Sequence, residues 1–404
     1  MNFSNLFRLL IISLFCFCLT GCFKWAARAK NKLPEKTALH KTYEYKGKVI
    51  IIGAGASGLA AAKVLEQNNI EYLILEATNR YGGRIKKDTT LADFPIDVGA
   101  EWLHSNPITL NKLKGKTGDK IDEELIPYRL ENTASWDGKK YKTNPNWINN
   151  FAYNFMPESK FKRTTWYDFI DENIAKNVKD KIQFNSPVTC IDYTKNEVLI
   201  TTSNGKIYKA DKVLVTVSLG VLKSNMITFK PELSPKKKEA IKSISFELGL
   251  KVIMKFHKKF YPDAIEYKVK NGEKVFYDMA FKKDSKSHIL GFLCKGEEAK
   301  KYYALGSERK IISKLINELN EIFDGKAYFC FSGKYIVENW GESDYTLGTW
   351  TVAALEKKSA LKTLNIPLHK KVYFAGEIYD PYQQMGVPGA VLSGYYAADK
   401  LLSE

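Results

Sequence analysis

The sequence predicts an α/β fold built around one strand–turn–helix–strand unit near residue 50. The apolar run Val49–Ile52, rich in β-branched residues, is long enough for one buried parallel strand. The glycine-rich run 53–58 follows at once, and residues 59–65 then show helical spacing. A second apolar run, Tyr72–Leu75, ends in Glu76. This order of strand, glycine turn, helix, strand and acid indicates a Rossmann-like dinucleotide-binding unit.

The residues of this unit each have a physical role. Gly53 permits the tight turn, Gly55 lets a pyrophosphate approach the backbone, and Gly58 lets the helix pack closely on the strand. The N–H groups that open the helix near Ser57 face the phosphates. Glu76 lies where a carboxylate accepts hydrogen bonds from ribose hydroxyls, and it would repel a ribose phosphate, so NADP is disfavoured. An ordinary glycine-rich turn is the alternative, but the strand, helix and acid all stand in place.

The sequence beyond Glu76 resembles a known family. The run from Glu76 to Arg84, EATNRYGGR, resembles the E-A-x-x-R-x-G-G-R signature of the flavin-containing amine oxidases, which include polyamine oxidases, monoamine oxidases and flavin histone demethylases. Residues 97–104, DVGAEWLH, resemble the G-A-x-W-[IL]-H stretch of the polyamine oxidase branch. The resemblance covers nearly everything after Lys48 except residues 105–180. It implies a Rossmann-like FAD-binding domain interleaved with an α+β substrate domain.

The resemblance also implies where FAD is held. Val188 matches a position that contacts the adenine through its backbone, and Glu377, in FAGE, matches an acid near the ribityl and phosphate groups. A helix entered near Gly389 would place its N-terminal amides beside flavin N1 and O2. The expected FAD contacts are Gly53, Gly55, Ser57, Gly58, Glu76, Ala77, Arg84, Gly99, Ala100, Glu101, Trp102, Val188, Glu377, Val387, Gly389 and Ala390.

Three residues carry catalytic expectations by the same resemblance. Lys251 stands where the family has a lysine bonded through a water to flavin N5; the alternative is a surface lysine in a lysine-rich chain. Trp350 stands where the family has one wall of an aromatic slot for the amine; the alternative is a core tryptophan. His104 stands where polyamine oxidases have a histidine near the substrate; the alternative is a hydrogen-bonded surface histidine.

Two further positions depart from the monoamine oxidase pattern. Thr349 replaces the cysteine that links the flavin in those enzymes, and a threonine forms no thioether, so FAD is expected to be non-covalent. Gly386 replaces a tyrosine that forms the opposite wall of the slot. Tyr379, Tyr382 or Met385 would have to supply that wall.

The predicted organisation accounts for all 404 residues. A chain of this length, with 45% hydrophobic residues, suffices for two or three sub-domains with real cores. We expect a signal segment at 1–22, a basic linker at 23–47, an FAD-binding domain from 48–104, 181–225 and 338–404, and a substrate domain from 105–180 and 226–337.

The N-terminus predicts lipid attachment. The apolar run Leu9–Leu19 is shorter than the ~20 residues of a membrane-spanning helix but fits the core of a secretory signal. Leu19–Cys22, LTGC, resembles the bacterial lipobox, so Cys22 is the expected lipidation site, facing the periplasm or the outside. The alternative is an uncleaved anchor with the enzyme on the cytoplasmic face, which the basic residues after Cys22 favour.

Charge and cysteine usage limit the other partners. The net charge of +17 is spread along the chain with no nucleic-acid reader motif, so no nucleic acid is expected. Cys190, Cys294 and Cys330 form no metal-binding or disulfide pattern. No metal is expected.

The resemblance implies an oxidoreductase that transfers a hydride from the α-carbon of an amine to flavin N5. The products would be an imine and, with oxygen as acceptor, hydrogen peroxide. A tryptophan or amino-acid oxidase or monooxygenase of the same family stays open, as do a desaturase or porphyrinogen-type oxidase and a non-catalytic lipid-tethered flavoprotein. A chain at +17 attracts polyamine cations poorly, and the sequence leaves the amine open.

Overall fold

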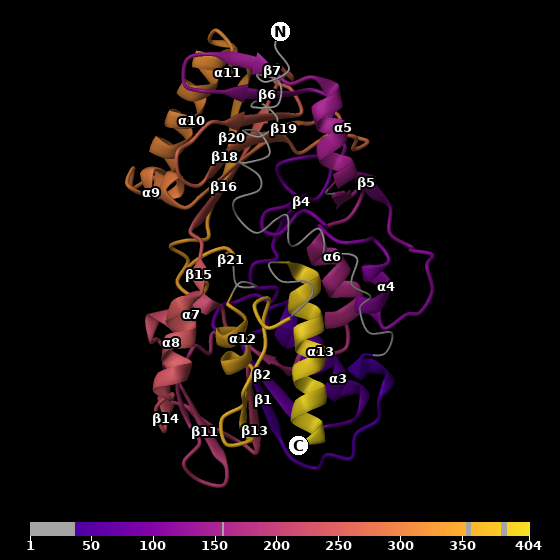
Figure 1. Cartoon of the computed structure of the whole chain (residues 1–404), viewed down its shortest axis with the longest axis vertical. Helices are drawn as coiled ribbons and strands as arrows, with labels where there is room; N and C mark the ends of the chain where they lie inside the picture. Colours follow the sequence, from indigo (N-terminus) through magenta and orange to yellow (C-terminus); the bar gives the residue numbers. More distant parts are fainter. Residues whose placement is uncertain (1–36, 156, 353–356, 381–385) are drawn as a thin grey trace.

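The computed structural model describes residues 37–155, 157–352, 357–380 and 386–404. They form two lobes stacked along the long axis (Figure 1). One lobe contains a five-stranded sheet and the other a seven-stranded sheet. The predicted signal segment, which includes Cys22, lies outside the described residues. Residues 23–36 of the predicted linker also lie outside them. Among the described residues, no helix has the length and apolarity needed to cross a membrane.

The five-stranded sheet is the predicted nucleotide-binding unit. β1 (Val49–Ile52) pairs in parallel with β2 (Tyr72–Leu75) and with β13 (Lys212–Val215). β22 (Val372–Phe374) and β9 (Ile182–Gln183) complete the order β22-β13-β1-β2-β9. All four residues of β1 are buried, as the continuous apolar run requires in a sheet covered on both faces. The strands predicted at 49–52 and 72–75 are confirmed.

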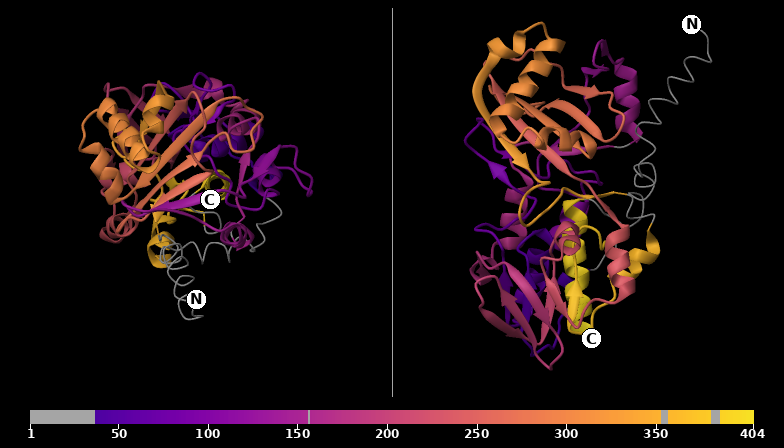
Figure 2. Two further views of the ribbon diagram at one scale, coloured as in Figure 1. Left: turned by 90° about the horizontal axis from the view of Figure 1, so that it is seen from above. Right: turned by 90° about the vertical axis from the view of Figure 1, so that its left-hand side faces the viewer.

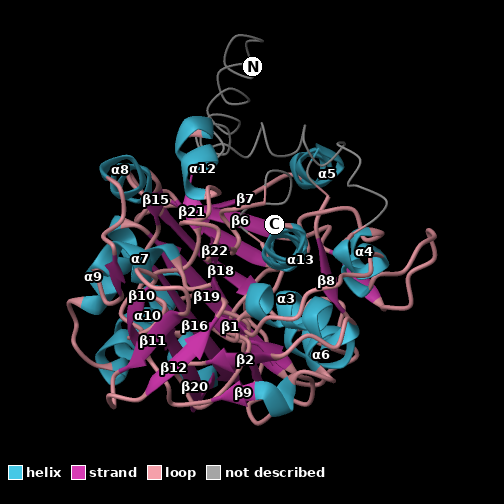
Figure 3. Cartoon of the chain, turned by 90° about the horizontal axis from the view of Figure 1, so that it is seen from below, coloured by secondary structure: helices cyan, strands magenta, loops and turns pink. Residues whose placement is uncertain are grey.

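Two helices cover one face of this sheet side by side. They are α3 (Ala56–Gln67), which follows the glycine turn, and α13 (Val387–Ser403), the last helix (Figures 1 and 3). Gly394 allows their close approach, since a Cβ there would lie 2.2 Å from the carbonyl oxygen of Ser57. The C-terminal helix expected from Gly389 is therefore confirmed, beginning two residues earlier.

A second layer covers the other face. It is a four-stranded sheet in the order β12-β11-β10-β14, with three short helices, and its apolar residues pack on the opposite side chains of β1 and β13. The elements are β10 (Val188–Asp192), β11 (Val198–Thr202), β12 (Ile207–Ala210), β14 (Thr228–Lys230), α7 (Leu219–Ser224), α8 (Pro235–Ser243) and α12 (Lys358–Leu364).

The upper lobe is built on the seven-stranded sheet, with helices over one face (Figure 2). Its order is β20 (Phe331–Asn339), β16 (Gly249–Phe256), β19 (His288–Lys295), β18 (Glu273–Asp278), β17 (Ala264–Tyr267), β6 (Thr133–Trp136) and β7 (Tyr141–Thr143). The helices are α9 (Glu297–Tyr303), α10 (Glu308–Ile322) and α11 (Lys326–Cys330). The apolar stripe of α10 is buried against the sheet, as its spacing predicts.

Residues 105–180 are divided between the lobes, which differs from their assignment to the substrate domain alone. β6 and β7 join the seven-stranded sheet, whereas Phe161, Trp166, Phe169 and Ile174 pack in the core beneath α3 and α13. The helical part of this stretch is α6 (Trp166–Ile170), followed by a π-helical turn at Asp171–Ala175. The remaining elements of this stretch are α4 (Thr109–Lys114), β5 (Leu125–Pro127), α5 (Asn146–Phe155) and β8 (Ser159–Phe161).

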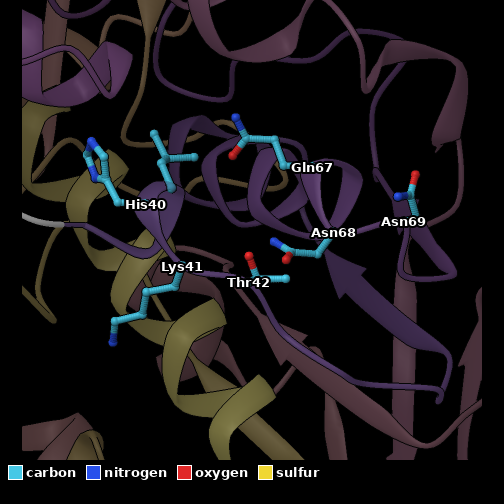
Figure 4. A pocket seen from close by; sticks show the side chains of 7 residues that line it. His40, Lys41, Thr42, Gln67, Asn68 and Asn69 are labelled. Carbon is cyan, nitrogen blue, oxygen red and sulfur yellow. The ribbon is translucent and has the colours of Figure 1, made fainter.

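Residues 37–47 pack on the protein, although we expected a solvated linker. Ala38 is buried, and Asp399 of α13 accepts hydrogen bonds from Lys41 Nζ at 2.8 Å and Tyr43 Oη at 2.6 Å. An open hollow of about 510 Å³ lies here, lined by residues 39–42 and 67–69 (Figure 4). It lies at the C-terminal end of α3, so a helix of about 18 Å separates it from the glycine turn.

Candidate functional site

The glycine turn leaves an open cradle at the start of α3. Gly53 has φ +103°, and a Cβ at Gly58 would lie 2.0 Å from the carbonyl oxygen of Gly53. At Gly55, the residue before the helix, a Cβ would meet no heavy atom within 4 Å. The buried hydroxyl of Ser57 has no hydrogen-bond partner among the described residues. Open space and an unpaired donor therefore meet at the positive end of the helix dipole, as a phosphate group requires.

The carboxylate of Glu76 is held beside this turn. Glu76 follows β2 and is buried, and its Oε2 accepts a hydrogen bond from the Ala54 N–H at 2.7 Å. Its Oε1 accepts from the backbone and hydroxyl of Thr78 at 3.0 and 2.8 Å. These bonds fix the acid next to the cradle, where a ribose can reach it. Ala77 is half-buried in the same loop.

The arginine pair organises the loop that follows. Arg80 donates to the carbonyl oxygens of Tyr81, Gly83 and Ile85, at 3.2, 2.6 and 3.2 Å. Arg84, in contrast, contacts residues that are far away in the sequence. Arg84 Nη1 lies 3.5 Å from Glu377 Oε1 and donates to the carbonyl oxygen of Thr349.

The remaining predicted FAD contacts border the same loop or the start of a helix or strand. Glu377 also accepts from Thr351 Oγ1 at 2.9 Å. Gly99 faces Arg84, since a Cβ at Gly99 would lie 1.9 Å from the Arg84 carbonyl oxygen. Val387, Gly389 and Ala390 form the first turn of α13, and Val188 begins β10. These residues fit a dinucleotide lying between the N-termini of α3 and α13.

Lys251 is buried at the junction of the two lobes. It lies on β16 and is 2% exposed, which excludes the surface-lysine alternative. Its Nζ donates to the carbonyl oxygens of Asp97 and Gly99, at 2.6 and 3.1 Å, and to Glu101 Oε2 at 2.8 Å. All three donors of the ammonium are therefore used.

Glu101 is shared by two lysines. Lys160 Nζ lies 2.5 Å from its Oε1, while Lys251 and the hydroxyl of Tyr277 bind its Oε2, each at 2.8 Å. Burial raises the pKa of the Glu101 carboxyl, but the two ammonium groups outweigh burial and lower that pKa to about 2. Lys160 and Tyr277 were not predicted, because nothing in their local sequence distinguishes them.

Asp97 lies beside this cluster with the opposite protonation preference. Burial and then the charge of Glu101 raise the pKa of Asp97 well above its ordinary value. One of its carboxyl oxygens accepts a hydrogen bond from the Trp166 N–H at 3.0 Å. The raised pKa favours the protonated form of Asp97, beside the two ammonium groups and the carboxylate of Glu101.

His104 is paired with a second acid. The chain pairs Leu103 with Ser159 in an antiparallel bridge, which sets His104 opposite Glu158. His104 Nδ1 lies 2.6 Å from Glu158 Oε1, and both side chains are partly exposed. Partial burial lowers the pKa of His104, but the Glu158 carboxylate prevails and raises it above the ordinary value. Glu158 was also missed by sequence reasoning.

The aromatic slot is only partly defined. Trp350 is half-buried, with Lys295 Nζ 5.5 Å from its ring centroid, so its role in catalysis stays a prediction. Tyr379 is buried and stacks on Phe374 of β22, so its role as a second wall stays a prediction. Tyr382 and Met385 lie outside the described residues.

Comparison with known families decides the class of protein. The family model described as flavin containing amine oxidoreductase matches residues 56–165 and 167–402. The chain belongs to this family. It is therefore a flavin-containing oxidoreductase acting on amine donors, and its cofactor is FAD.

The flavin amine oxidoreductase is similar to several curated proteins. It is 27% identical to human lysine-specific histone demethylase 2, over 90% of this chain and 54% of that protein. It is 25% identical to rice polyamine oxidase 4, over 87% and 88% of the two chains. Thus it spans about half the length of the demethylase and most of the polyamine oxidase.

Solved structures show the same two-domain fold. A structure of wild-type putrescine oxidase bound to putrescine has a TM-score of 0.71 with 15% identity, covering 90% of this chain and 100% of that one. At this identity the likeness shows the fold alone.

The glycine turn gives a matched pair of variants. Gly58→Ala places a Cβ 2.0 Å from a backbone oxygen, so we expect a loss of about 1–3 kcal/mol in the free energy of unfolding of the apoprotein. Gly55→Ala meets no protein atom and should change that free energy by less than about 0.5 kcal/mol. It should nevertheless weaken FAD binding at least about tenfold, because its methyl group fills the cradle. Urea unfolding measures the first effect and FAD titration the second. A stable Gly55→Ala variant with normal FAD affinity would show that the open space at Gly55 does not hold the FAD phosphates.

Glu101→Gln should destabilise the enzyme in a pH-dependent way. Removing the shared carboxylate leaves two buried ammonium groups without their counter-ion. This should lower the free energy of unfolding by about 3–5 kcal/mol at pH 7. The folded-state pKa of Glu101 lies below its ordinary value of 4.5, so its stabilisation is present above pH 4.5 and is lost as the pH falls toward 2. The difference from wild type should shrink by about 2 kcal/mol between pH 7 and pH 3. Urea unfolding across this range measures it, and a constant difference would refute the assignment.

Proposed function

We propose that this enzyme oxidises a small amine at its α-carbon, releasing an imine that hydrolyses, with oxygen as the final electron acceptor. The observation that carries the proposal is the buried ammonium of Lys251, bonded to the carbonyl oxygens of Asp97 and Gly99 beside the expected flavin contacts. Bound FAD supplies the acceptor for a hydride from the amine, and its reoxidation by oxygen yields hydrogen peroxide.

The charge of the cluster suits the protonation state that the substrate needs. Only an uncharged amine donates a hydride readily, because its nitrogen lone pair must stabilise the cation that forms. Lys160 and Lys251 outnumber the single carboxylate of Glu101 once Asp97 is protonated. A net positive environment lowers the pKa of a bound ammonium and so favours its neutral form.

Lys251 positions the site through its three hydrogen bonds. They hold the loop 97–101 against β16, and the 3.1 Å bond to Gly99 is the longest of them. Because the ammonium has no fourth donor, binding a water requires that one of these bonds be exchanged. The bond to Gly99 is the one we expect to open.

Among the described residues, no specific observation favours the desaturase alternative or the non-catalytic alternative. The Lys251–Glu101 pair lies beside the expected flavin contacts, which supports a role for Lys251 in amine oxidation. The choice between simple amines and amino acids depends on whether the site can bind a substrate carboxylate. Arg80 and Arg84 already bind groups of the protein in the loop after Glu76 and at Glu377. Among the described residues, we therefore find no arginine near this cluster that is available for a substrate carboxylate.

Anaerobic flavin bleaching tests the proposal. The purified protein without residues 1–22 is mixed with monoamines, diamines and amino acids, and the flavin absorbance near its long-wavelength maximum is followed. We expect at least one amine class to bleach the flavin, and hydrogen peroxide to form once oxygen is admitted. An FAD-loaded protein that no amine reduces would show that the proposed function is wrong.

Lys251→Met serves as the matched variant in this assay. We expect it to retain FAD and to slow flavin reduction or reoxidation at least about tenfold. Lys255→Met is the control, because Lys255 lies on the same strand and, within the described part of the chain, its ammonium bonds to the Leu91 carbonyl oxygen instead of to Glu101. Equal rates in wild type and Lys251→Met would remove Lys251 from the mechanism.

A further inference from the structure

The ammonium of Lys160 is enclosed by three aromatic rings. Its Nζ lies 4.7 Å from the ring centroid of Tyr128, 5.3 Å from that of Tyr277 and 5.4 Å from that of Trp102. Glu101 Oε1 lies 2.5 Å from the same nitrogen. Only 2% of Lys160 is exposed. We call these three rings and the Glu101 carboxylate the ammonium box.

The bridge between Leu103 and Ser159 explains how the chain builds the box. In this antiparallel pair, Trp102 lies opposite Lys160, and His104 lies opposite Glu158. Side chains two residues apart point to the same face of a strand, so all four share one face. Along it, exposure falls from 41% at the His104 side chain to 2% at Lys160.

The box lies between the partly exposed His104–Glu158 pair and the buried Lys251. The His104–Glu158 pair is at the partly exposed end, and Lys160 follows with its ammonium in the box. Glu101 then joins Lys160 to Lys251 at the lobe junction. An amine that reaches Lys251 along this face passes the box.

The chemistry of the box is that of a receptor for a primary ammonium group. Aromatic faces and a carboxylate together attract a desolvated cation. Here the cation is a side chain of the protein. A second ammonium entering beside it would bring three cations to the single charge of Glu101, which is unfavourable in a buried site.

We propose that Lys160 occupies a subsite for a distal ammonium and thereby restricts this enzyme to amines that carry a single cationic group. The inference rests on the proposed amine oxidation and names its substrate class: monoamines whose tails are neutral or anionic. The net charge of +17 acts in the same direction, since it repels dications more strongly than monocations.

The variant that tests the proposal is Lys160→Ala. It vacates the box but leaves Glu101 neutralised by Lys251, so the fold keeps its central ion pair. The measured quantity is kcat/KM for anaerobic flavin reduction by n-butylamine and by 1,4-diaminobutane, which have equal carbon chains. We expect wild type to prefer the monoamine, and the diamine-to-monoamine ratio to rise at least about tenfold in Lys160→Ala. A wild type that prefers the diamine, or an unchanged ratio in the variant, overturns the proposal.

Lys274→Ala is the matched control. Lys274 is also a buried lysine held by an aromatic ring and a carboxylate, with its Nζ 4.0 Å from the Tyr267 centroid and 2.8 Å from Glu318 Oε2. It lies on β18, and its ammonium binds Glu318 of α10 rather than Glu101. Its loss should leave the diamine-to-monoamine ratio unchanged. A rise equal to that of Lys160→Ala would show a general loosening and would count against the box.

A binding measurement separates this inference from the proposed function. n-Propylammonium chloride should raise the melting temperature of Lys160→Ala by a larger margin than that of wild type, because only the variant offers the vacated box in addition to the site of the reacting amine. 1-Propanol and sodium chloride should show no such difference between the two proteins. This holds even if no amine reduces the flavin, in which case only the proposed function fails. Absence of selective stabilisation counts against the box. If Lys160→Ala does not fold, Lys160→Met carries the kinetic test, with an expected rise of at least about threefold and the same overturning result.

Discussion

The carboxylate of Glu101 is the constraint on which the site depends. It is buried at the junction of the lobes and contacts Lys160 of β8, Lys251 of β16 and Tyr277 of β18. A buried charge is tolerated only when it is paired and hydrogen-bonded. In the observed arrangement these three partners satisfy Glu101, and the loop 97–101 is held against the seven-stranded sheet. The cradle at Gly55 is formed locally, but its relation to Lys251 depends on this loop.

The same carboxylate determines the electrostatics of the cluster. Because Glu101 keeps its charge and Asp97 is biased toward its protonated form, one negative charge serves two ammonium groups. In the function that we propose, a surplus of positive charge would favour an uncharged amine for oxidation and disfavour a second cation on the substrate. Chemistry and selectivity would then have one origin, which is the number of lysines around one acid.

The local parts of the structure could be predicted from the sequence. The unit from Val49 to Glu76 depends on short apolar runs and on glycines whose conformations or close contacts are fixed within a few residues. Lys251 and Glu377 were found through their resemblance to family positions rather than through any local pattern.

The parts that depend on distant packing could not be predicted. Lys160 becomes important only because the bridge at Leu103 brings it to Trp102, and no spacing in the sequence encodes that pairing. Similarly, the segment 161–178 joins the core beneath α3 through its aromatic residues, although its neighbours in sequence join the other lobe. Residues 37–47 are polar and basic, yet Asp399 anchors them to the last helix. A polar, basic composition indicates that a segment can be exposed to solvent, but it does not predict hydrogen bonds to residues far away in the sequence.

A double-mutant cycle between Glu101 and Lys251 tests the central claim most directly. The free energies of unfolding of wild type, Glu101→Gln, Lys251→Met and the double variant are measured in urea at pH 7. If the shared carboxylate holds the lobes in register, the two substitutions should be coupled by about 2 kcal/mol or more, because each removes the partner of the other. Effects that add within about 0.5 kcal/mol would contradict the account.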